Sequence, residues 1–170
     1  MSFGKNIKNV LISVFNKEGL EPILSILKRN SSKIYSTGGT FDYLKEKGFR
    51  ATKIEDVTKY PSILNGRVKT LHPKIFGGIL ARTNNKSDNE EIKKYEMFSF
   101  DLLIVDLYPF SKTVNETNDE KKIIEKIDIG GVSLIRAAAK NYKDVLVVSN
   151  KSQYEDLANI LDNTKLLNTT

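Results

Sequence analysis

The chain has 170 residues, a formal net charge of +6 and no cysteine. This length suits one folded domain, and the lack of cysteine excludes disulfide bonds and thiolate metal sites. The basic residues are spread along the chain without a Lys/Arg block or interleaved aromatics, which argues against a nucleic-acid-binding protein. Two interpretations of the charge stay open: a solvated lysine-rich surface, or attraction of a small anionic substrate.

The first apolar run of the chain begins at Val10 and has the length of a β-strand. Such a run is too short for the core of a signal peptide and far too short to cross a bilayer. We therefore expect a cytoplasmic protein that does not bind membranes. No linker or internal repeat interrupts the pattern, so residues 1–170 are expected to form a single domain.

The first third of the chain alternates between strand and helix patterns. The expected elements are strands at residues 10–15, 33–36 and 51–54, a helix starting at 20, and a helix over 41–47. Thr40 is expected to be the N-cap of the second helix, and Gly48 is expected to end it. This order predicts an α/β fold whose parallel strands are joined by right-handed crossovers.

The rest of the chain continues the pattern after a segment without clear periodicity, residues 55–82, which is expected to be irregular and functional. Two capping boxes, Ser87-x-x-Glu90 and Ser152-x-x-Glu155, predict helix starts. The remaining expected elements are strands at 102–107 and 145–148 and helices at 119–127 and 132–140, with fraying after residue 161.

Three polar clusters follow expected strands, at Ser13–Lys17, Ser36–Thr40 and Asp106–Tyr108. The carboxyl ends of parallel strands meet at one edge of a sheet, where ligands of such folds bind. We therefore expect these clusters to converge on one site.

The cluster Ser36-Thr37-Gly38-Gly39-Thr40 has the chemistry of an anion site. Glycines let backbone N–H groups approach an anion, hydroxyls donate further hydrogen bonds, and a following helix presents its positive end. The cluster is neither a Walker loop nor a dinucleotide fingerprint. A plain strand-to-helix turn is the alternative, and Lys17 strengthens the phosphate interpretation.

The stretch from Asn65 to Pro73 places Arg67, Lys69, Thr70 and the chain's one histidine, His72, between two turn signals. The three first-named side chains suit an anionic substrate. His72 could act as a general base, but a His-Pro turn is more often structural, and a lone histidine without cysteine favours neither a catalytic triad nor a metal site.

A second glycine-opened helix is expected after Asp128-Ile-Gly130-Gly131, and it ends near Lys140. An acid and a lysine could form a proton-transfer pair. The alternative is an ordinary aspartate at a helix N-terminus together with a solvated lysine.

Taken together, the motifs resemble a known family. In order they are Ser13-Val-Phe-Asn-Lys17, Ser36-Thr-Gly-Gly-Thr40, Asn65-Gly-Arg-Val-Lys-Thr-Leu-His-Pro73, Leu107-Tyr-Pro-Phe110, Ile127-Asp-Ile-Gly-Gly131 and Arg136-Ala-Ala-Ala-Lys-Asn141. This series resembles the inosine monophosphate (IMP) cyclohydrolase domain of the bifunctional purine-biosynthesis proteins, over about residues 10–154. The motif from Asn65 to Pro73 is the most specific of the six.

The resemblance implies a three-layer, doubly wound, methylglyoxal-synthase-like domain with a five-stranded parallel sheet. It implies a hydrolase of the cyclic amidine class, running in the ring-closing direction, that converts the formamido ribonucleotide FAICAR to IMP without cofactor or metal. Neither nucleic acid nor membrane is an implied partner, and a homodimer is one open option for assembly. We expect the formyltransferase domain that follows in the family to be absent, and its activity is not predicted for these 170 residues.

The resemblance also implies residue roles. Lys69, Tyr108, Asp128 and Lys140 would be catalytic, with Lys69 near the developing oxyanion. The substrate-binding residues would be Ser13, Lys17, Ser36, Thr37, Gly38, Gly39, Thr40, Arg67, Thr70, Asp106, Gly130 and Gly131.

The sequence departs from the family pattern at Asp106, where the family usually has asparagine. If that side chain contacts the base, an acceptor-only carboxylate replaces an amide that also donates, which would change specificity or rate. One alternative is therefore a catalytically weakened descendant. Two others are a nucleotide-binding regulatory module of the carbamoyl phosphate synthetase type and a methylglyoxal synthase.

Overall fold

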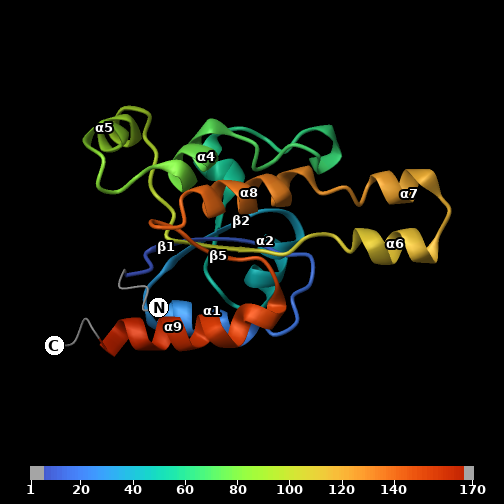
Figure 1. Ribbon diagram of the computed structural model, residues 1–170, viewed down its shortest axis with the longest axis horizontal. Coiled ribbons are helices and arrows are strands. Elements are labelled where there is room, and N and C mark those ends of the chain that lie inside the picture. The colour runs from blue at the N-terminus through green and yellow to red at the C-terminus, as the bar shows by residue number, and fades with distance from the viewer. Residues whose placement is uncertain (1–5, 167–170) are drawn as a thin grey trace.

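A computed structural model describes residues 6–166 of the chain. Its centre is a sheet of five parallel strands in the order β3-β2-β1-β4-β5 (Figure 1). The strands are β1 (Asn9–Ser13), β2 (Lys33–Ser36), β3 (Thr52–Lys53), β4 (Leu102–Val105) and β5 (Leu146–Val148). The predicted α/β class and five-stranded parallel sheet are confirmed.

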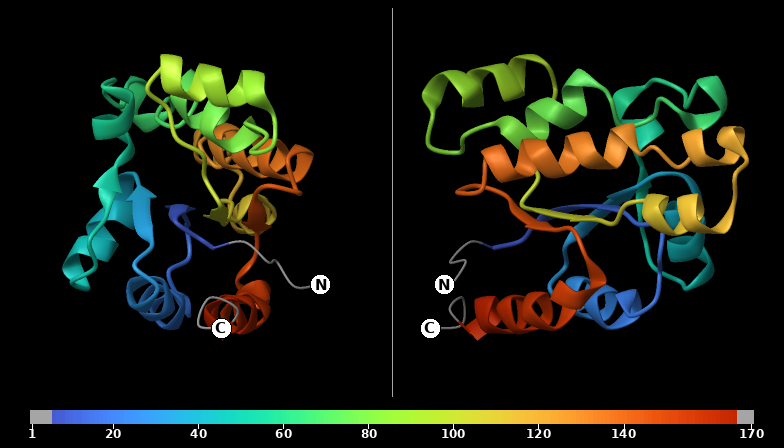
Figure 2. Two further views of the ribbon diagram at one scale, coloured as in Figure 1. Left: turned by 90° about the vertical axis from the view of Figure 1, so that its left-hand side faces the viewer. Right: turned by 45° about the vertical axis from the view of Figure 1, so that its right-hand side comes forward.

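Helices cover both faces of the sheet, which gives three layers (Figure 2). On one face α1 packs beside α9, and on the other α4 packs beside α8. The helices are α1 (Leu20–Arg29), α2 (Gly38–Glu46), α3 (Ile54–Thr58), α4 (Pro73–Leu80), α5 (Lys86–Lys94), α6 (Phe110–Glu116), α7 (Glu120–Ile124), α8 (Ile129–Lys140) and α9 (Tyr154–Leu166), with short 3-10 turns η1 (Leu64–Gly66) and η2 (Lys151–Gln153).

The central strand β1 shows why the sheet needs helices on both faces. Val10 and Ile12 belong to the core cluster beneath α1 and α9, while Leu11 between them belongs to the cluster beneath α4 and α8. All three side chains are fully buried. Successive side chains of a strand alternate between faces, so a continuous apolar run predicts burial on both sides.

The order of the strands places a switch point next to β1. The chain runs from β1 to β2 and β3 on one side, and then returns to add β4 and β5 on the other. The connections that leave β1 and β4 therefore diverge, and a crevice opens between them at the carboxyl ends of the strands.

Several predicted boundaries were wrong. The helix expected at 41–47 begins at Gly38, so its N-cap is Thr37 and not Thr40. Neither predicted serine capping box exists: α5 is capped by Asn85, and the C-terminal capping box is formed by Asn150 and Gln153 around η2. The 3-10 turn η2 precedes α9, so the capping residue is Asn150, two residues before the predicted Ser152.

The segment 55–82, expected to be irregular, contains α3, η1 and α4. Helix α4 escaped notice because it is short and carries two glycines, Gly77 and Gly78, which lower helix propensity. A built Cβ at Gly78 would lie 2.4 Å from the carbonyl oxygen of Phe98, so this glycine permits close packing. Helix α6 was also missed, and α9 continues past residue 161 to Leu166; residues 167–170 lie outside the described part of the chain.

Within residues 6–166 there is no helix with the length and apolar character that crossing a bilayer requires.

Candidate active site

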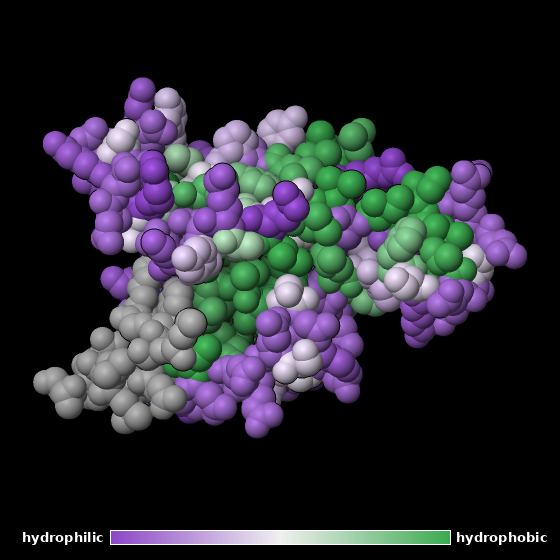
Figure 3. All heavy atoms as spheres, in the orientation of Figure 1, coloured by the Kyte–Doolittle hydropathy of each residue, from purple (hydrophilic) through white to green (hydrophobic). Residues whose placement is uncertain are grey.

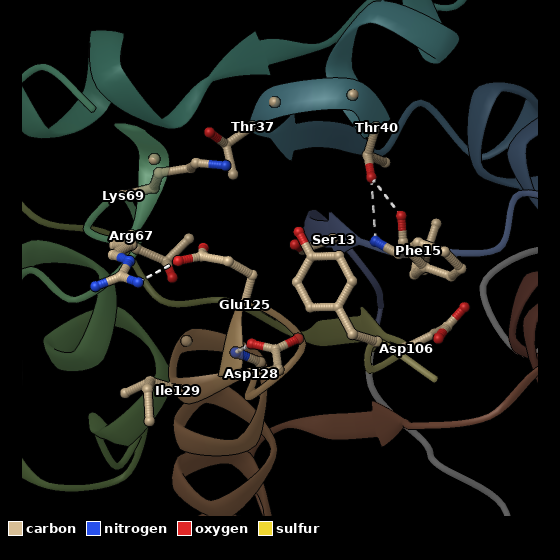
Figure 4. Close-up of a pocket in the computed structure, with 18 of the residues that line it drawn as sticks. Ser13, Phe15, Thr37, Thr40, Arg67, Lys69, Asp106, Glu125, Asp128 and Ile129 are labelled. Carbon is tan, nitrogen blue, oxygen red and sulfur yellow. Dashed lines mark hydrogen bonds and ion pairs between the residues drawn. The ribbon is translucent and has the colours of Figure 1, made fainter. Parts of the chain in front are cut away.

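A cavity of about 670 Å³ lies beyond the carboxyl ends of β1, β2 and β4 (Figure 4). Its walls come from the segments that follow these strands, from the loop after η1, and from the chain between α7 and α8. The expected convergence of the polar clusters at this edge of the sheet is thus observed. The fourteen predicted site residues that line the cavity are Ser13, Lys17, Thr37, Gly38, Gly39, Thr40, Arg67, Lys69, Thr70, Asp106, Tyr108, Asp128, Gly130 and Gly131.

The first turn of α2 presents backbone N–H groups to the cavity. Its N-cap, Thr37, makes no side-chain cap hydrogen bond, and Gly38 and Gly39 are both exposed. A built Cβ on Gly39 would meet no atom within 4 Å, so the approach to this turn is open. Uncapped N–H groups at a helix N-terminus attract anions through their own dipoles and through the dipole of the helix.

The hydroxyls of Thr37 and Thr40 form hydrogen bonds within the protein. The buried Thr40 hydroxyl donates to the carbonyl of Val14 at 2.9 Å and accepts from the Val14 N–H at 3.1 Å, which fastens α2 to the end of β1. The Thr37 hydroxyl donates to Oε1 of Glu55 at 2.8 Å. The backbone N–H groups of this turn are therefore the main groups that remain available to bind an anion.

Ser36 does not line the cavity, contrary to its predicted role in substrate binding. Its side chain is fully buried, and its hydroxyl donates to the carbonyl of Ile12 at 2.7 Å. Ser36 is the last residue of β2 and is paired with Ile12 of β1, so its hydroxyl is used within the sheet.

The turn before Arg67 is unusual in its backbone. Leu64, Asn65 and Gly66 have positive φ angles of 52°, 53° and 87° in succession. Asparagine and glycine tolerate this region best, which is the physical sense of the Asn-Gly pair in the motif. The turn brings the following residues, including Lys69, to the cavity.

At one edge of the cavity, Lys69 extends toward Thr37 and the first turn of α2 (Figure 4). Its Nζ would lie 3.4 Å from a Cβ built on Gly38, and its Cε 2.6 Å from one built on Gly66. Both glycines thus leave room for this lysine, and an ammonium group stands beside the uncapped helix end. The arrangement gives that end a second source of positive charge.

Asp128 is the N-cap of α8, and its Oδ1 accepts a hydrogen bond from the N–H of Gly131 at 2.7 Å. A built Cβ on Gly131 would lie 2.7 Å from Oδ2 of Asp128, so the close approach requires glycine here. Gly130 packs against Thr70, which joins this helix end to the loop that carries Arg67 and Lys69.

The predicted pairing of Asp128 with Lys140 is not formed. Asp128 caps one end of α8 and Lys140 is the last residue at the other end, about 18 Å away at 1.5 Å per residue. Lys140 is exposed and does not line the cavity. The alternative interpretation, a helix-capping aspartate with a solvated lysine, describes the geometry of this chain.

Asp106 supports the loop after β1. Its Oδ2 accepts a hydrogen bond from the N–H of Asn16 at 2.7 Å. An asparagine oxygen can accept the same bond, so the departure from the family pattern leaves this contact available. Burial, together with the negative charge of Asp106, raises the pKa of Tyr154 to about 12.

Tyr108 forms an aromatic pair with Phe15 at the mouth of the cavity. The ring centroids are 5.3 Å apart in an edge-to-face arrangement, and Nζ of Lys126 lies 5.4 Å from the Phe15 ring and 5.2 Å from the Tyr108 ring. Ammonium groups at this distance are attracted to aromatic faces. Lys126 therefore ties the chain after α7 to the ends of β1 and β4.

Glu125 is a cavity residue that the sequence did not indicate. Its carboxylate forms an ion pair with the guanidinium of Arg67, and the two side chains point toward one another in Figure 4. This hydrogen bond and the negative charge of Glu125 raise the pKa of Arg67. Ile124, Ile127 and Ile129, also unpredicted, add an apolar wall beside the pair.

His72 has a structural position. It is the N-cap of α4, and its Nδ1 accepts from the N–H of Lys74 at 3.1 Å. His72 does not line the cavity. Among residues 6–166 no group of three or more histidine, aspartate or glutamate side chains is arranged to hold a metal ion.

Comparison with known proteins places this geometry in context. A family model described as an MGS-like domain matches residues 19–133. The bifunctional purine biosynthesis protein PurH of Bacteroides thetaiotaomicron is 54% identical over 161 residues, and that of Clostridium acetobutylicum is 45% identical over 158 residues. These matches cover 95% and 93% of the chain respectively. The resemblance recognised in the motifs is confirmed.

A crystal structure of ForH has the same fold, with a TM-score of 0.80 and 31% sequence identity over 92% of the chain and 79% of ForH. By contrast, the chain spans about a third of the length of the two PurH relatives, since it matches 32% of each.

Proposed function

The chain belongs to the family of MGS-like domains, and we propose that it is an IMP cyclohydrolase that closes the ring of FAICAR to give IMP and water. One observation carries the proposal: the loops after β1, β2 and β4, the Arg67–Thr70 loop and the start of α8 line a single cavity. Homology to PurH supports the same function.

The cavity offers two chemically different ends for such a substrate. The uncapped first turn of α2, together with Lys17, suits the 5′-phosphate. The opposite side, with Asp128, Tyr108 and the wall from Ile124 to Ile129, suits a planar base that carries a carboxamide and a formamide. A cavity of this size accommodates a nucleotide monophosphate.

Ring closure joins two groups of one molecule. The carboxamide nitrogen attacks the formyl carbon, a C–N bond forms, and the electrons of the C=O bond move to oxygen. The attacking nitrogen loses one proton, the formamide nitrogen loses a second, and the oxygen takes up both. Water leaves as the C–O bond breaks and a C=N bond forms to the formamide nitrogen. Because both groups belong to one substrate, holding them in contact supplies much of the rate.

In this proposal Lys69 stabilises the oxyanion, since its ammonium group enters the cavity on a loop fixed by Asn65 and Gly66. Asp128 uses one carboxylate oxygen as a helix cap, which leaves the second for proton exchange with the substrate. Tyr108 orients the base at the mouth of the cavity. Lys140 does not line the cavity, and no step of this proposal is assigned to it.

The test is a cofactor-free assay in which the purified chain is mixed with FAICAR and IMP is followed by its absorbance. Rapid formation of IMP is the expected result. Tight binding of FAICAR without product would indicate a weakened or regulatory domain. If the chain neither binds nor converts FAICAR, the proposed function is wrong for the chain as it stands.

A further inference from the structure

The charged side chains that line the cavity are balanced in number, but they are held differently. The cations are Lys17, Arg67 and Lys69, and the carboxylates are Asp106, Glu125 and Asp128. Asp106 and Asp128 each accept a hydrogen bond from a backbone N–H at 2.7 Å. Glu125 alone among these three carboxylates is paired with a cavity cation, Arg67.

The pairing matters because the cavity has two places where a phosphate could bind. One is the uncapped turn Thr37–Thr40, with Lys69 beside it. The other is the guanidinium of Arg67, a group whose fork of N–H donors matches phosphate oxygens. In Figure 4 Arg67 lies on the side of the cavity formed by Glu125 and Ile129, away from Thr40.

We propose that Glu125 fixes the direction in which a nucleotide monophosphate lies in the cavity, by neutralising Arg67 and so confining the phosphate to the Thr37–Thr40 turn. This inference rests on the proposed function, because it assumes a substrate with one anionic end and one neutral end. Arg67 has five N–H donors, and those that Glu125 leaves unused are available to neutral carbonyl groups of the base. Glu125 thereby acts as a positioning residue.

The surroundings of the pair suit this role. The side chains of Arg67 and Glu125 are 61% and 59% exposed, so the pair has little value for stability and its removal should not unfold the protein. Glu125 follows α7, a helix without buried residues, while Arg67 follows η1, which also has none. The pair therefore links two exposed segments across one side of the cavity.

The matched test compares Glu125→Gln with Glu116→Gln. Glu116 lies in α6, where it pairs with Lys112 at 3.7 Å and does not line the cavity, so its substitution removes the same charge nearby. Binding of inorganic phosphate is measured by titration calorimetry, with thermal unfolding as the check on folding. This measurement requires no turnover and so stays informative if the proposed function is wrong.

The expected result is one phosphate site in the unsubstituted chain and in Glu116→Gln, and a second site in Glu125→Gln. The double variant Arg67→Ala/Glu125→Gln should lose the second site. With FAICAR as substrate, Glu125→Gln should show about five-fold stronger inhibition by phosphate, the effect of one unit charge at about 4 Å in water. Its kcat should fall as well, because inverted substrate does not react.

Three outcomes would overturn the inference. Glu125→Gln could bind phosphate with the stoichiometry and affinity of the unsubstituted chain, or the second site could survive in the double variant. The unsubstituted chain could also bind no phosphate, which would remove the turn Thr37–Thr40 as an anion site. A lack of turnover together with the expected phosphate stoichiometries would instead reject FAICAR as the substrate and keep the role of Glu125.

Discussion

The two sides of the cavity are built in opposite ways. On the sheet side, the loops continue from strands whose side chains are buried, and Thr40 is fastened to β1 by two hydrogen bonds. On the other side stands the α6–α7 hairpin, residues 110–124, which projects from the body of the molecule (Figures 1 and 2) and has no buried residue.

The apolar surface follows the same division. Exposed hydrophobic side chains occur in and after the hairpin, and Figure 3 shows hydrophobic residues gathered at the end of the molecule that carries it. These residues include Phe110, Val114, Ile124, Ile127 and Ile129. Under the proposed function, the preorganised side would bind the phosphate and the exposed side would adapt to the base.

Stability measurements test the difference between the sheet side and the hairpin side most directly. Leu103→Ala in β4 should lower the free energy of unfolding by about 2–5 kcal/mol, because it leaves a cavity beneath a fully buried position. Ile124→Ala in the hairpin, where the side chain is 46% exposed, should change it by less than about 0.5 kcal/mol. Urea denaturation of both variants checks this, and equal losses would show that the hairpin is covered in solution.

The next effect concerns catalysis. Lys69→Ala should lower kcat for FAICAR about 100-fold to 1,000-fold, as expected when a donor to an oxyanion is removed. The melting temperature should stay close to that of the unsubstituted chain. Lys86→Ala on α5, far from the cavity, is the control for loss of a lysine. Near-normal kcat in Lys69→Ala would contradict the role assigned to this residue.

Variants of Asp128 can separate a structural role from a chemical one, because this residue caps α8 and also lines the cavity. Asp128→Ala should cost about 1 kcal/mol of stability through the lost cap, together with most of the activity. Asp128→Asn keeps an oxygen for the Gly131 N–H, so stability should be largely retained while activity is lost. If Asp128→Asn turned over FAICAR normally, the carboxylate would have no part in proton transfer.

The smallest effect is expected at Asp106, on the sheet side. Asp106→Asn should leave stability and kcat nearly unchanged, since the amide oxygen can accept from the N–H of Asn16. It should also lower the pKa of Tyr154 from about 12, because one cause of the raised value is the charge of Asp106. Spectroscopic titration of the tyrosines measures this shift, and a large loss of kcat would show that the carboxylate serves the reaction.

The sheet side of the site could be read from the sequence, and the hairpin side could not. Apolar runs such as residues 102–105 predict buried parallel strands. In a parallel sheet, the residues that follow the strands lie at the same edge of the sheet. Thr37 and Gly38 line the cavity for that reason. Ser36 does not line the cavity for an equally local reason: its hydroxyl is bonded to the carbonyl of Ile12 inside the sheet.

Nothing in the sequence indicates the contacts of Glu125 and Lys126, because their partners are distant in the chain. Arg67 precedes Glu125 by 58 residues, and exposed charges on a short helix normally mean a solvated surface. The expected contact between Lys140 and Asp128 is not formed, and the reason is again one of position in the chain. The proximity of Lys140 to Asp128 in sequence suggested a pair, but twelve residues of helix hold the two ends apart.

The position of β1 in the middle of the sheet has a consequence for how the protein is made. Strand β1 is synthesised well before its neighbour β4. Asn9 and Asp101, which are hydrogen-bonded at the amino end of this pair, are 92 residues apart. Until β4 arrives, one edge of β1 has no strand to pair with, and an unpaired apolar edge invites association with other chains. Folding should therefore be slow for a domain of this size, and the newly made chain should be most prone to aggregate before residue 102 is synthesised.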